Sequence, residues 1–525
     1  MNAHNMIRTE VLVIGAGPVG LTLACDLVRR GVACHVIERV DAPSRASKAK
    51  GIQSRSLEVL DDLGAVDYVV RHGIAELPVR FHDPSGATVD RPPVTIPAAP
   101  YFHTPYPNML WIGQFDVEHA LRERLYQLGG TIEYGAEAIA LKQDSDHVMV
   151  TVRTAAGERA VEARYAVGTD GGKSTVRHLI DLPLNGETRD TERWYLGDVT
   201  VPGLPRDRIH VFTSDSGMLV LTPLPSTDIW QFQNRIPDDA DPAEPSLELY
   251  QRLLDDRNAG ITLASATWLS IYRVNIRMVE DYRRGRVLLA GDAAHVHSPA
   301  GGQGMNTGIQ DAYNLGWKLG AVIAGAAPDL LNSYATERIP VARTVLELST
   351  QRLDRVTDAA NGDIVQASDA LSALADSELT TGLGIHYGER TVTHDHTHPV
   401  AGDRAPNVTG LHGSDGTLAL FDLTRGPQWT LLAFDIADSA KDLIKSLESN
   451  ELHVYRITST PGDGIVDRDS EFEQLYTPEP GELILIRPDG YLADCVTATE
   501  SNLEKTVSTL QQLMPASSGD CPEFS

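Results

Sequence analysis

One stretch of the sequence, residues 281–314, combines a carboxylate, a glycine-rich loop and the start of a helix. A short apolar run predicts a strand that ends beside Asp292, whose carboxylate can hold a sugar or ribityl hydroxyl. Gly302 and Gly304 leave backbone N–H groups open to a ligand. The helix that we expect to begin at about Met305–Asn306 favours a partial negative charge at that loop, as a reduced flavin carries near N1 and its C2 carbonyl.

The N-terminal segment has the glycine spacing of a dinucleotide-binding turn, VLVIGAGPVG over residues 11–20. In this pattern Gly15 permits the tight turn, Gly17 lets a pyrophosphate approach the backbone, and Gly20 lets helix and strand pack closely. A second predicted strand ends at Glu38, 23 positions after Gly15, where an acidic side chain should meet the ribose hydroxyls of ADP. Strand, glycines, helix, strand and acid therefore follow the order of a βαβ nucleotide-binding unit.

A third motif, DGGKSTVR at residues 170–177, lies between these two. Together with GAGPVG and the GDAAH of residues 291–295, it resembles the three fingerprints of the class A flavoprotein monooxygenases, the para-hydroxybenzoate hydroxylase family, over residues 8–515. The phenol and polyketide hydroxylase branch is the one it looks like. The resemblance implies FAD, NAD(P)H as reductant, and hydroxylation of a phenolic or polyketide-type aromatic by O₂ through a flavin C4a-hydroperoxide.

The resemblance also assigns residues to the cofactor. It puts Arg39 beside the adenine, Gln114 at the pyrophosphate or ribityl chain, and Asp170 at both FAD and NAD(P)H. Relatives place an arginine where this chain has Lys48, and a lysine lacks the planar two-pronged phosphate contact, so Arg45 is an alternative. The FAD-binding residues so implied are Gly15, Gly17, Gly20, Glu38, Arg39, Arg45, Lys48, Gln114, Ile139, Asp170, Gly171, Asp292, Gly302, Gly304, Met305 and Asn306.

Fewer residues are assigned to the substrate side. The backbone carbonyl of Pro299 matches the family segment that lines the reactive face of the flavin, and His297 is a candidate for touching substrate or peroxide. The substrate-facing candidates are Trp230, Phe232, Asn234 and Tyr272. No metal site is predicted, because the histidines of residues 394–398 have no second ligand cluster.

The predicted fold class is α/β: a Rossmann-like FAD-binding domain of the glutathione-reductase-2 type, an inserted antiparallel-sheet substrate domain and a C-terminal thioredoxin-like domain. The last lacks a CxxC motif, which argues against a redox role. Strands are expected in this domain near residues 431–434, 452–457 and 483–486, and a helix over 500–513. In the FAD-binding domain, helices are expected to begin at Ser54 and Gln114 and to occupy residues 308–358. The expected parts are the FAD-binding domain over 1–75, 111–185 and, with further helices, 281–358; a substrate-domain excursion over 76–110; the substrate domain over 186–280; a linker over 359–400; and the thioredoxin-like domain over 401–525.

Composition and net charge limit the classes of molecule that this chain is expected to bind. The 525 residues carry a formal net charge of −27 and no basic tract, which disfavours nucleic acid and acidic lipid. No targeting segment or apolar run of membrane-spanning length is evident, and the four cysteines have no metal or CxxC spacing. We expect a cytoplasmic monomer or homodimer whose partners are a small aromatic substrate and O₂.

Two other functions remain open on the same motifs. One is oxygenation of the Baeyer–Villiger or ring-opening kind. The other is a protein with a structural flavin and no oxygenation, such as a cyclase. The lack of a second GxGxxG argues against reductases with two dinucleotide domains, and the lack of WxWxIP argues against a halogenase.

Overall fold

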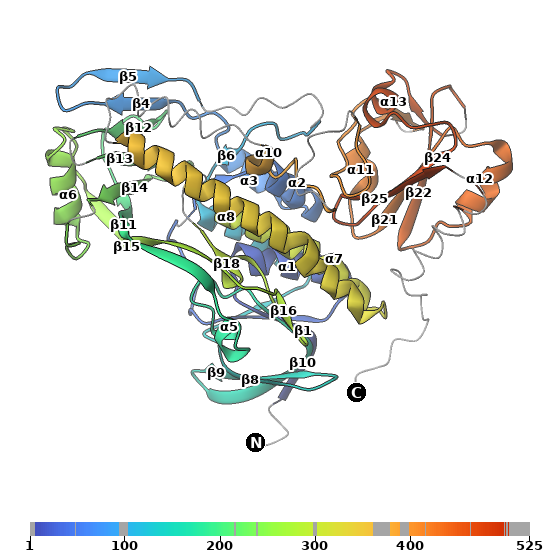
Figure 1. Cartoon of the computed structure of the whole chain (residues 1–525), viewed down its shortest axis with the longest axis horizontal. Coiled ribbons are helices and arrows are strands. Elements are labelled where there is room, and N and C mark those ends of the chain that lie inside the picture. The colour runs from blue at the N-terminus through green and yellow to red at the C-terminus, as the bar shows by residue number, and fades with distance from the viewer. Residues whose placement is uncertain are drawn as a thin grey trace.

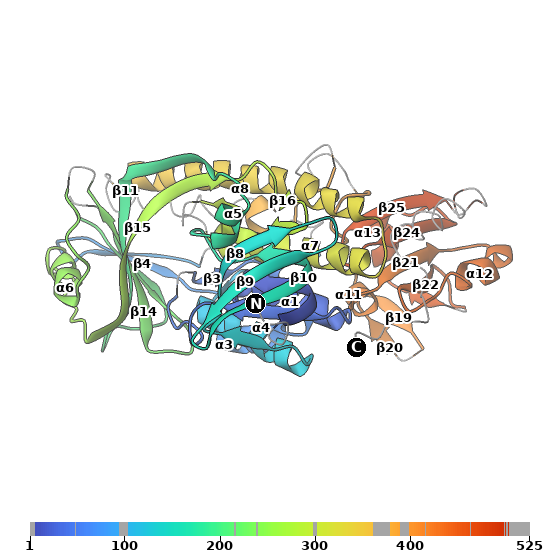
Figure 2. The ribbon, with the colours of Figure 1, turned by 90° about the horizontal axis from the view of Figure 1, so that it is seen from below.

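The structure is a computed structural model that describes residues 6–47, 49–93, 103–214, 217–237, 240–297, 302–360, 378–388, 398–414, 416–462 and 464–497, together with 499 and 502. Three units, each built on its own sheet, lie in a row (Figure 1). We call them the antiparallel unit, the dinucleotide unit and the C-terminal unit, and the dinucleotide unit lies in the middle (Figure 2). No helix among the described residues is long and apolar enough to cross a membrane.

The dinucleotide unit contains an eight-stranded sheet with a parallel centre. Strand β1 pairs in parallel with β2 and with β10, and the run Val11–Ile14 is buried. A parallel strand covered on both faces is apolar throughout, which explains the sequence VLVI. Helix α1 packs against both α4 and α7. The elements are β16 (Arg283–Arg284), β17 (Val287–Leu289), β10 (Gly157–Gly168), β1 (Met6–Ile14), β2 (Cys34–Glu38) and β7 (Ile132–Tyr134), with β8 (Glu137–Gln143), β9 (Val148–Thr154), α1 (Pro18–Arg29), α4 (Gln114–Gln127) and α7 (Gln303–Ile323).

The antiparallel unit is a second eight-stranded sheet. Every neighbouring pair is antiparallel except β12 and β4, which run parallel. Helix α6 (Leu247–Asp255) covers one face, where Tyr250 stacks on Phe232 with ring centroids 4.5 Å apart. The order is β18 (His295–Val296), β15 (Ser265–Met278), β11 (Asn185–Thr200), β14 (Ile229–Ile236), β13 (Leu219–Pro223), β12 (Ile209–Phe212), β4 (Val79–His82) and β5 (Thr88–Arg91).

The C-terminal unit has a mixed seven-stranded sheet. The strands that the sequence predicts near residues 431–434, 452–457 and 483–486 are present as β21, β22 and β24. The helix predicted over 500–513 lies outside the described residues, apart from residue 502. The order is β20 (Gly416–Leu418), β19 (Leu411–Gly413), β23 (Ile465–Asp467), β22 (Leu452–Thr458), β21 (Trp429–Phe434), β24 (Glu482–Ile486) and β25 (Leu492–Thr497), with α11 (Leu420–Thr424), α12 (Asp438–Lys445) and α13 (Glu471–Tyr476).

Shorter elements connect these units. The helical residues expected over 308–358 belong to two helices, α7 and α8, which are separated because Gly325 adopts φ +116° and Pro328 then begins a new turn. The long helix α8 runs across the molecule from the C-terminal unit, which its first turns contact, toward the antiparallel unit (Figures 1 and 2). These elements are β3 (Gly51–Ile52), which pairs with β6 (Leu110–Trp111), α2 (Ser54–Leu63), α3 (Val66–His72), α5 (Thr175–Leu179), η2 (Gly291–Ala293), η3 (Pro328–Leu331), α8 (Asn332–Ala360) and α10 (Glu378–Thr381).

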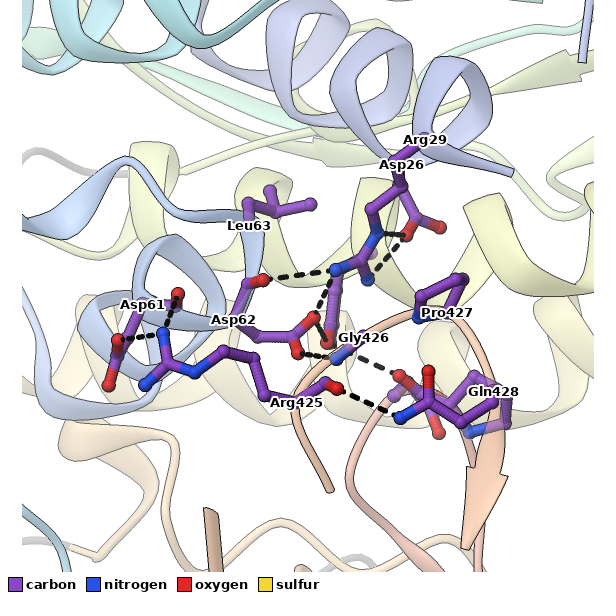
Figure 3. Close-up of polar contacts among 12 residues, drawn as sticks. Asp26, Arg29, Asp61, Asp62, Leu63, Arg425, Gly426, Pro427 and Gln428 are labelled. Atoms are coloured by element: carbon purple, nitrogen blue, oxygen red, sulfur yellow. Dashed lines mark hydrogen bonds and ion pairs between the residues drawn. The ribbon is translucent and has the colours of Figure 1, made fainter. Parts of the chain in front are cut away.

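The C-terminal unit docks on helices of the dinucleotide unit. Figure 3 shows Arg425 on the carboxylate of Asp61 at 2.6 Å, and the Gly426 N–H donating to Asp62 at 2.7 Å. Asp62 also pairs with Arg29 of α1 at 2.7 Å. The docking therefore holds two helices in place. Helix α1 begins within the dinucleotide motif, and α2 follows β3.

Candidate functional site

The glycine turn after β1 is built as a nucleotide cradle. Gly15 has φ +112°, and a Cβ there would lie 2.6 Å from the Thr169 carbonyl oxygen. A Cβ on Gly20 would lie 1.9 Å from the Gly15 oxygen, so only glycine permits this approach of helix to turn. At Gly17 an added Cβ meets no described atom within 4 Å, and α1 begins there with no side-chain cap. The first N–H groups of α1 thus face open space that suits a phosphate.

The acidic residue at the end of β2 lies at this turn. Glu38 accepts hydrogen bonds from the N–H of Ala16 at 2.8 Å and of Val40 at 3.2 Å. Glu38 and Arg39 both line the cavity, as does Gln114, whose side chain donates to Glu118 at 2.7 Å. The structure therefore brings these three predicted residues together.

Other predicted residues lie elsewhere. Arg45 is exposed and is not among the cavity-lining residues. Ile139 is not among them either, although Ala136, Glu137 and Ala138 are. Lys48 lies outside the described residues. The adenine end of the cavity is consequently lined by neighbours of the predicted positions.

The central Asp-Gly motif joins the cradle through β10. Asp170 and Gly171 line the cavity, and Asp170 Oδ2 accepts from the N–H of Val176 at 3.1 Å. Its buried Oδ1 has no hydrogen-bond partner among the described residues, so it is available to a ligand. Arg177 donates to the carbonyl oxygens of Gly172 and Ala293, tying the two loops to each other.

The Gly-Asp motif of residues 291–295 and the start of α7 form the floor of the cavity. Asp292, Gly302, Gly304 and Met305 all line it. Helix α7 begins with Gly302 as N-cap at φ +63°, again without a side-chain cap. This is two or three residues earlier than the sequence predicts, and the N-terminal N–H groups of a long helix point at the cavity, where they favour negative charge.

Asn306 positions the site and does not line it. Its Oδ1 accepts from the Gln53 N–H at 2.8 Å, and its Nδ2 donates to the carbonyl oxygens of Gly302 at 2.8 Å and Gly51 at 3.2 Å. The side chain is fully buried. Asn306 thus joins α7 to the segment before α2.

One continuous cavity of about 1270 Å³ runs from the glycine turn to the antiparallel sheet. Trp230, Phe232 and Asn234 do not line it, because they project from the opposite face of β14, where Trp230 and Phe232 pack in the core under α6. Side chains alternate along a strand, so Gln231 and Gln233 face the cavity instead. The sequence reading selected the wrong face of β14.

Tyr272 and His297 do reach the cavity. The Tyr272 hydroxyl donates to the His297 carbonyl oxygen at 2.9 Å, and burial together with the Asp292 carboxylate raises the pKa of Tyr272 above its ordinary value. A Cβ on Gly304 would lie 3.5 Å from the His297 ring, which places this ring beside the start of α7. Pro299 lies outside the described residues.

Several cavity residues were not predicted from the sequence. The sequence gives only a weak indication of these residues, because it does not show which face of a strand, or which distant segment, meets the cavity. Thr380 of α10 belongs to the predicted linker, and its carbonyl accepts from Gln303 at 3.1 Å. Unpredicted lining residues are Lys50, Trp194, Met218, Thr222, Gln231, Gln233, Trp268, Ser270 and Thr380.

The residues present fit FAD. An uncapped helix with an open Gly17 suits the pyrophosphate, and Glu38 lies where a ribose should be. Asp292 lines the same cavity beside the start of α7, since a Cβ on Gly304 would lie 3.7 Å from its Oδ1. Asp170 Oδ1 adds an acceptor that the described protein groups leave unused. The donor and acceptor set therefore matches a long dinucleotide with a polyol chain.

Removing the Asp292 carboxylate tests this fit. Asp292 is exposed in the protein, so Asp292→Ala should fold normally. Loss of one or two hydrogen bonds to a charged acceptor should weaken FAD binding about 10- to 100-fold. Flavin absorbance per protein after gel filtration measures the retention, and Asp292→Asn, which keeps one oxygen acceptor, should lose less. Full flavin content in the alanine variant would refute the role of Asp292.

Comparison with known proteins agrees with this geometry. The FAD binding domain model matches residues 8–349, and the model for the C-terminal domain of aromatic-ring hydroxylases matches residues 398–514. The chain is 37% identical over 504 residues to a flavin-dependent monooxygenase of Mycobacteroides abscessus, covering 94% of this chain and 98% of that protein.

Two further relatives come from Streptomyces rimosus. The chain is 34% identical over 510 residues to a 6-methylpretetramide 4-monooxygenase, covering 92% of this chain and 90% of that protein. The solved structure of an anhydrotetracycline hydroxylase is similar with a TM-score of 0.75 and 30% sequence identity, covering 96% of this chain and 99% of that one. The chain therefore belongs to the FAD-binding aromatic-ring hydroxylases, and it is an FAD-dependent aromatic monooxygenase.

Proposed function

We propose that this enzyme hydroxylates a phenolic or polyketide-type aromatic, with NAD(P)H as the reductant of its FAD and O₂ as the oxygen source. The observation that carries the proposal is the single cavity, which joins the nucleotide cradle to the wall of the antiparallel sheet. FAD held in the cradle would pass two electrons from NAD(P)H to O₂, so that one oxygen atom enters the ring and the other leaves as water. The residues of the chain bind, orient and enclose the reactants.

The wall opposite the cradle suits a flat, hydroxylated aromatic. Trp194, Met218 and Trp268 supply apolar surface, which keeps the space dry. Thr222 and Gln233 place polar groups between them, and these can orient the hydroxyls of a substrate. The two relatives named for 6-methylpretetramide and anhydrotetracycline support a substrate of that chemical class.

The start of α7 supplies the charge stabilisation that reduction requires. Its N-terminal N–H groups have no side-chain cap beyond Gly302, so their partial positive charge faces the cavity. This partial positive charge would stabilise negative charge on a reduced cofactor held there. His297 beside Gly304 and Tyr272 beside His297 close the same end of the cavity.

We also infer finer assignments of the fold. The parallel sheet with its glycine turn supports a glutathione-reductase-2 type of FAD domain, divided as the sequence predicts. The strand order β19-β23-β22-β21-β24-β25 supports a thioredoxin-like C-terminal unit with β23 added. Cys495 is the one cysteine of this unit within the described residues, and burial raises its pKa to about 12, so a docking role fits this unit better than a redox one.

Anaerobic reduction tests the function. NADPH and NADH are each mixed with the FAD-loaded enzyme, with and without a phenol panel that includes hydroxynaphthacene and hydroxyanthraquinone compounds. Bleaching of the visible flavin band that accelerates with one of these aromatics is expected. On admitting air, the product should carry one added oxygen atom and an intact ring.

Other outcomes identify the alternatives. An inserted ring oxygen or an opened ring would indicate the Baeyer–Villiger or ring-opening reaction. Failure of both nicotinamides to bleach the flavin, with or without an aromatic, would refute the proposed hydroxylase and favour a structural flavin.

A further inference from the structure

A short segment before α2, which consists of Ser47 and residues 49–53, crosses between the two halves of the cavity. We call it the crossing segment. At one end it is tied to the start of α7, since Asn306 binds the Gly51 oxygen and the Gln53 N–H. At the other end it is tied to the antiparallel sheet. The backbone N–H of Ser47 donates to the carboxylate of Asp198 of β11 at 2.7 Å, and the backbone carbonyl oxygen of Ser47 accepts from the side-chain amide of Gln231 of β14 at 2.5 Å. Lys50 lies between these two anchors.

The Lys50 side chain extends to the cavity wall formed by β13 and β14 of the antiparallel sheet, which we call the substrate wall. Its Nζ donates to Thr222 Oγ1 of β13 at 3.0 Å and to Gln233 Oε1 of β14 at 2.5 Å. Both acceptors are neutral, and all three residues line the cavity. A lysine ammonium has three N–H donors, so these two bonds leave one donor for a ligand.

Within the part of the chain that the structure describes, Lys50 forms no ion pair with a carboxylate. Burial alone lowers the pKa of Lys50 to about 7, with no contribution from a nearby acid. The carboxylates that line the cavity belong to the nucleotide end, and they are Glu38, Glu118, Glu137, Asp170 and Asp292. On the antiparallel side, the titratable side chains are Tyr272, the neighbouring His297 and the buried Asp198 of β11, whose carboxylate accepts from the Ser47 N–H. Burial raises the pKa of Asp198 to about 6, and none of these three groups shifts the pKa of Lys50.

A purely structural role would not need this charge. An amide could join β13 and β14 to the crossing segment without the cost of desolvating an ammonium. A cation held in a water-poor cavity between neutral oxygens is stabilised by an anionic ligand, and a hydrogen bond between opposite charges is stronger than a neutral one. An aromatic substrate offers such an anion when its hydroxyl ionises.

We propose that Lys50 recognises an ionisable hydroxyl of the aromatic substrate and holds it as the oxyanion against the β13–β14 wall. A neutral Lys50 amine takes the phenolic proton and becomes the ammonium, which leaves an ammonium–phenolate pair. An ionised Lys50 donates N–H to a phenolate that arrives already deprotonated. Since a phenolate ring is richer in electrons than the phenol, this residue selects substrates that are prepared for oxygen transfer. The inference rests on the proposed hydroxylase function.

Alizarin, a dihydroxyanthraquinone whose visible colour changes on ionisation, is a suitable probe, with its dimethyl ether as the matched non-ionisable compound. Both are titrated into the FAD-loaded oxidised enzyme at a pH where free alizarin is protonated. The wild type should bind alizarin in its ionised colour and prefer it to the ether. Lys50→Met should bind alizarin about 10- to 100-fold more weakly, without the ionised colour, and should bind the ether as before.

Two controls keep the result interpretable. Lys142→Met removes an exposed lysine of β8 and should behave like the wild type. Flavin content and thermal midpoint show that each variant is folded and loaded. Even if Lys50→Met does not fold, the wild type alone decides: equal affinity for alizarin and its ether, or a bound alizarin that stays protonated, would overturn the role of Lys50.

The two proposals fail separately. If the wild type shows no preference for the ionisable probe but an aromatic still accelerates flavin bleaching, the Lys50 inference falls and the hydroxylase stands. If the wild type binds neither probe and no aromatic accelerates bleaching, both fall.

Discussion

Replacing Gly17 with valine should give a folded protein that cannot hold FAD. Gly17 has φ −76°, which any residue adopts, and an added Cβ meets no described atom within 4 Å. The branched side chain therefore fits the protein but fills the space in front of the first N–H groups of α1. Loss of two or more charge-assisted hydrogen bonds to a pyrophosphate should weaken FAD binding at least about 100-fold.

The measurement is the yellow colour of the purified variant and its titration with FAD. Circular dichroism and the thermal midpoint should match those of wild-type apoprotein. Gly20→Ala is the matched comparison, because its Cβ would lie 1.9 Å from the Gly15 oxygen and should damage the packing of α1 itself. A Gly17→Val protein that purifies with full flavin would show that the pyrophosphate lies elsewhere.

The nucleotide end of the site could be predicted because local pattern and topology agree there. Strand β1 is an unbroken apolar run, and the helices predicted to begin at Ser54 and Gln114 do begin there. Parallel strands place their carboxyl ends at one edge of a sheet. Motifs that follow β1, β2 and β10 were therefore expected to meet, and Gly15, Glu38 and Asp170 line one cavity.

The substrate wall could not be predicted in this way. The strand IWQFQNRI alternates aromatic or apolar with polar residues, which marks two faces but does not say which one meets a ligand. The aromatic face was assigned to the substrate, yet α6 covers that face and Phe232 stacks on Tyr250. The glutamine face lines the cavity because the crossing segment and α7 lie on that side, and those contacts join residues more than 150 positions apart.

The same limit applies to residues whose role depends on distant contacts. Asn306 was placed at the flavin from its position in the motif, whereas its amide joins α7 to the backbone of Gly51 and Gln53. Lys50 lies in a short segment that carries none of the three motifs. No local pattern shows that its ammonium reaches Thr222 and Gln233.

The second large effect is expected at Glu337, where the C-terminal unit meets α7 and α8. Its carboxylate binds Arg487 through both oxygens at 2.9 Å and Lys318 at 2.8 Å. Asn314 donates to it at 2.7 Å, and Asp489 shares Arg487. Nearby, Trp317 packs edge-on against Trp429, with ring centroids 5.4 Å apart. The charged cluster around Glu337 therefore lies beside an apolar part of the contact between the units.

Glu337→Ala should lower the free energy of unfolding by about 3–5 kcal/mol, because it leaves Lys318 and Arg487 as buried charges with too few partners. Urea denaturation followed by tryptophan fluorescence measures the change. Asp438→Ala, which breaks the exposed pair with Lys441 on α12, is the matched control and should shift the midpoint little. A similar small shift at Glu337 would mean that the cluster does not stabilise the docked unit.

The pH dependence separates lost charge from lost packing. Burial alone would raise the pKa of Glu337, but Arg487 and Lys318 overcome it and hold the pKa well below its ordinary value. As the pH falls through about 4.3, an unfolded chain takes up a proton at this glutamate while the folded chain does not, so the stability that the carboxylate contributes is present above that pH and is lost below it. The difference in unfolding free energy between the wild type and Glu337→Gln should therefore shrink from pH 7 to pH 4 and below. A difference that stays constant over that range would mean that the glutamine disturbs packing and that the carboxylate charge is not what holds the C-terminal unit on α7.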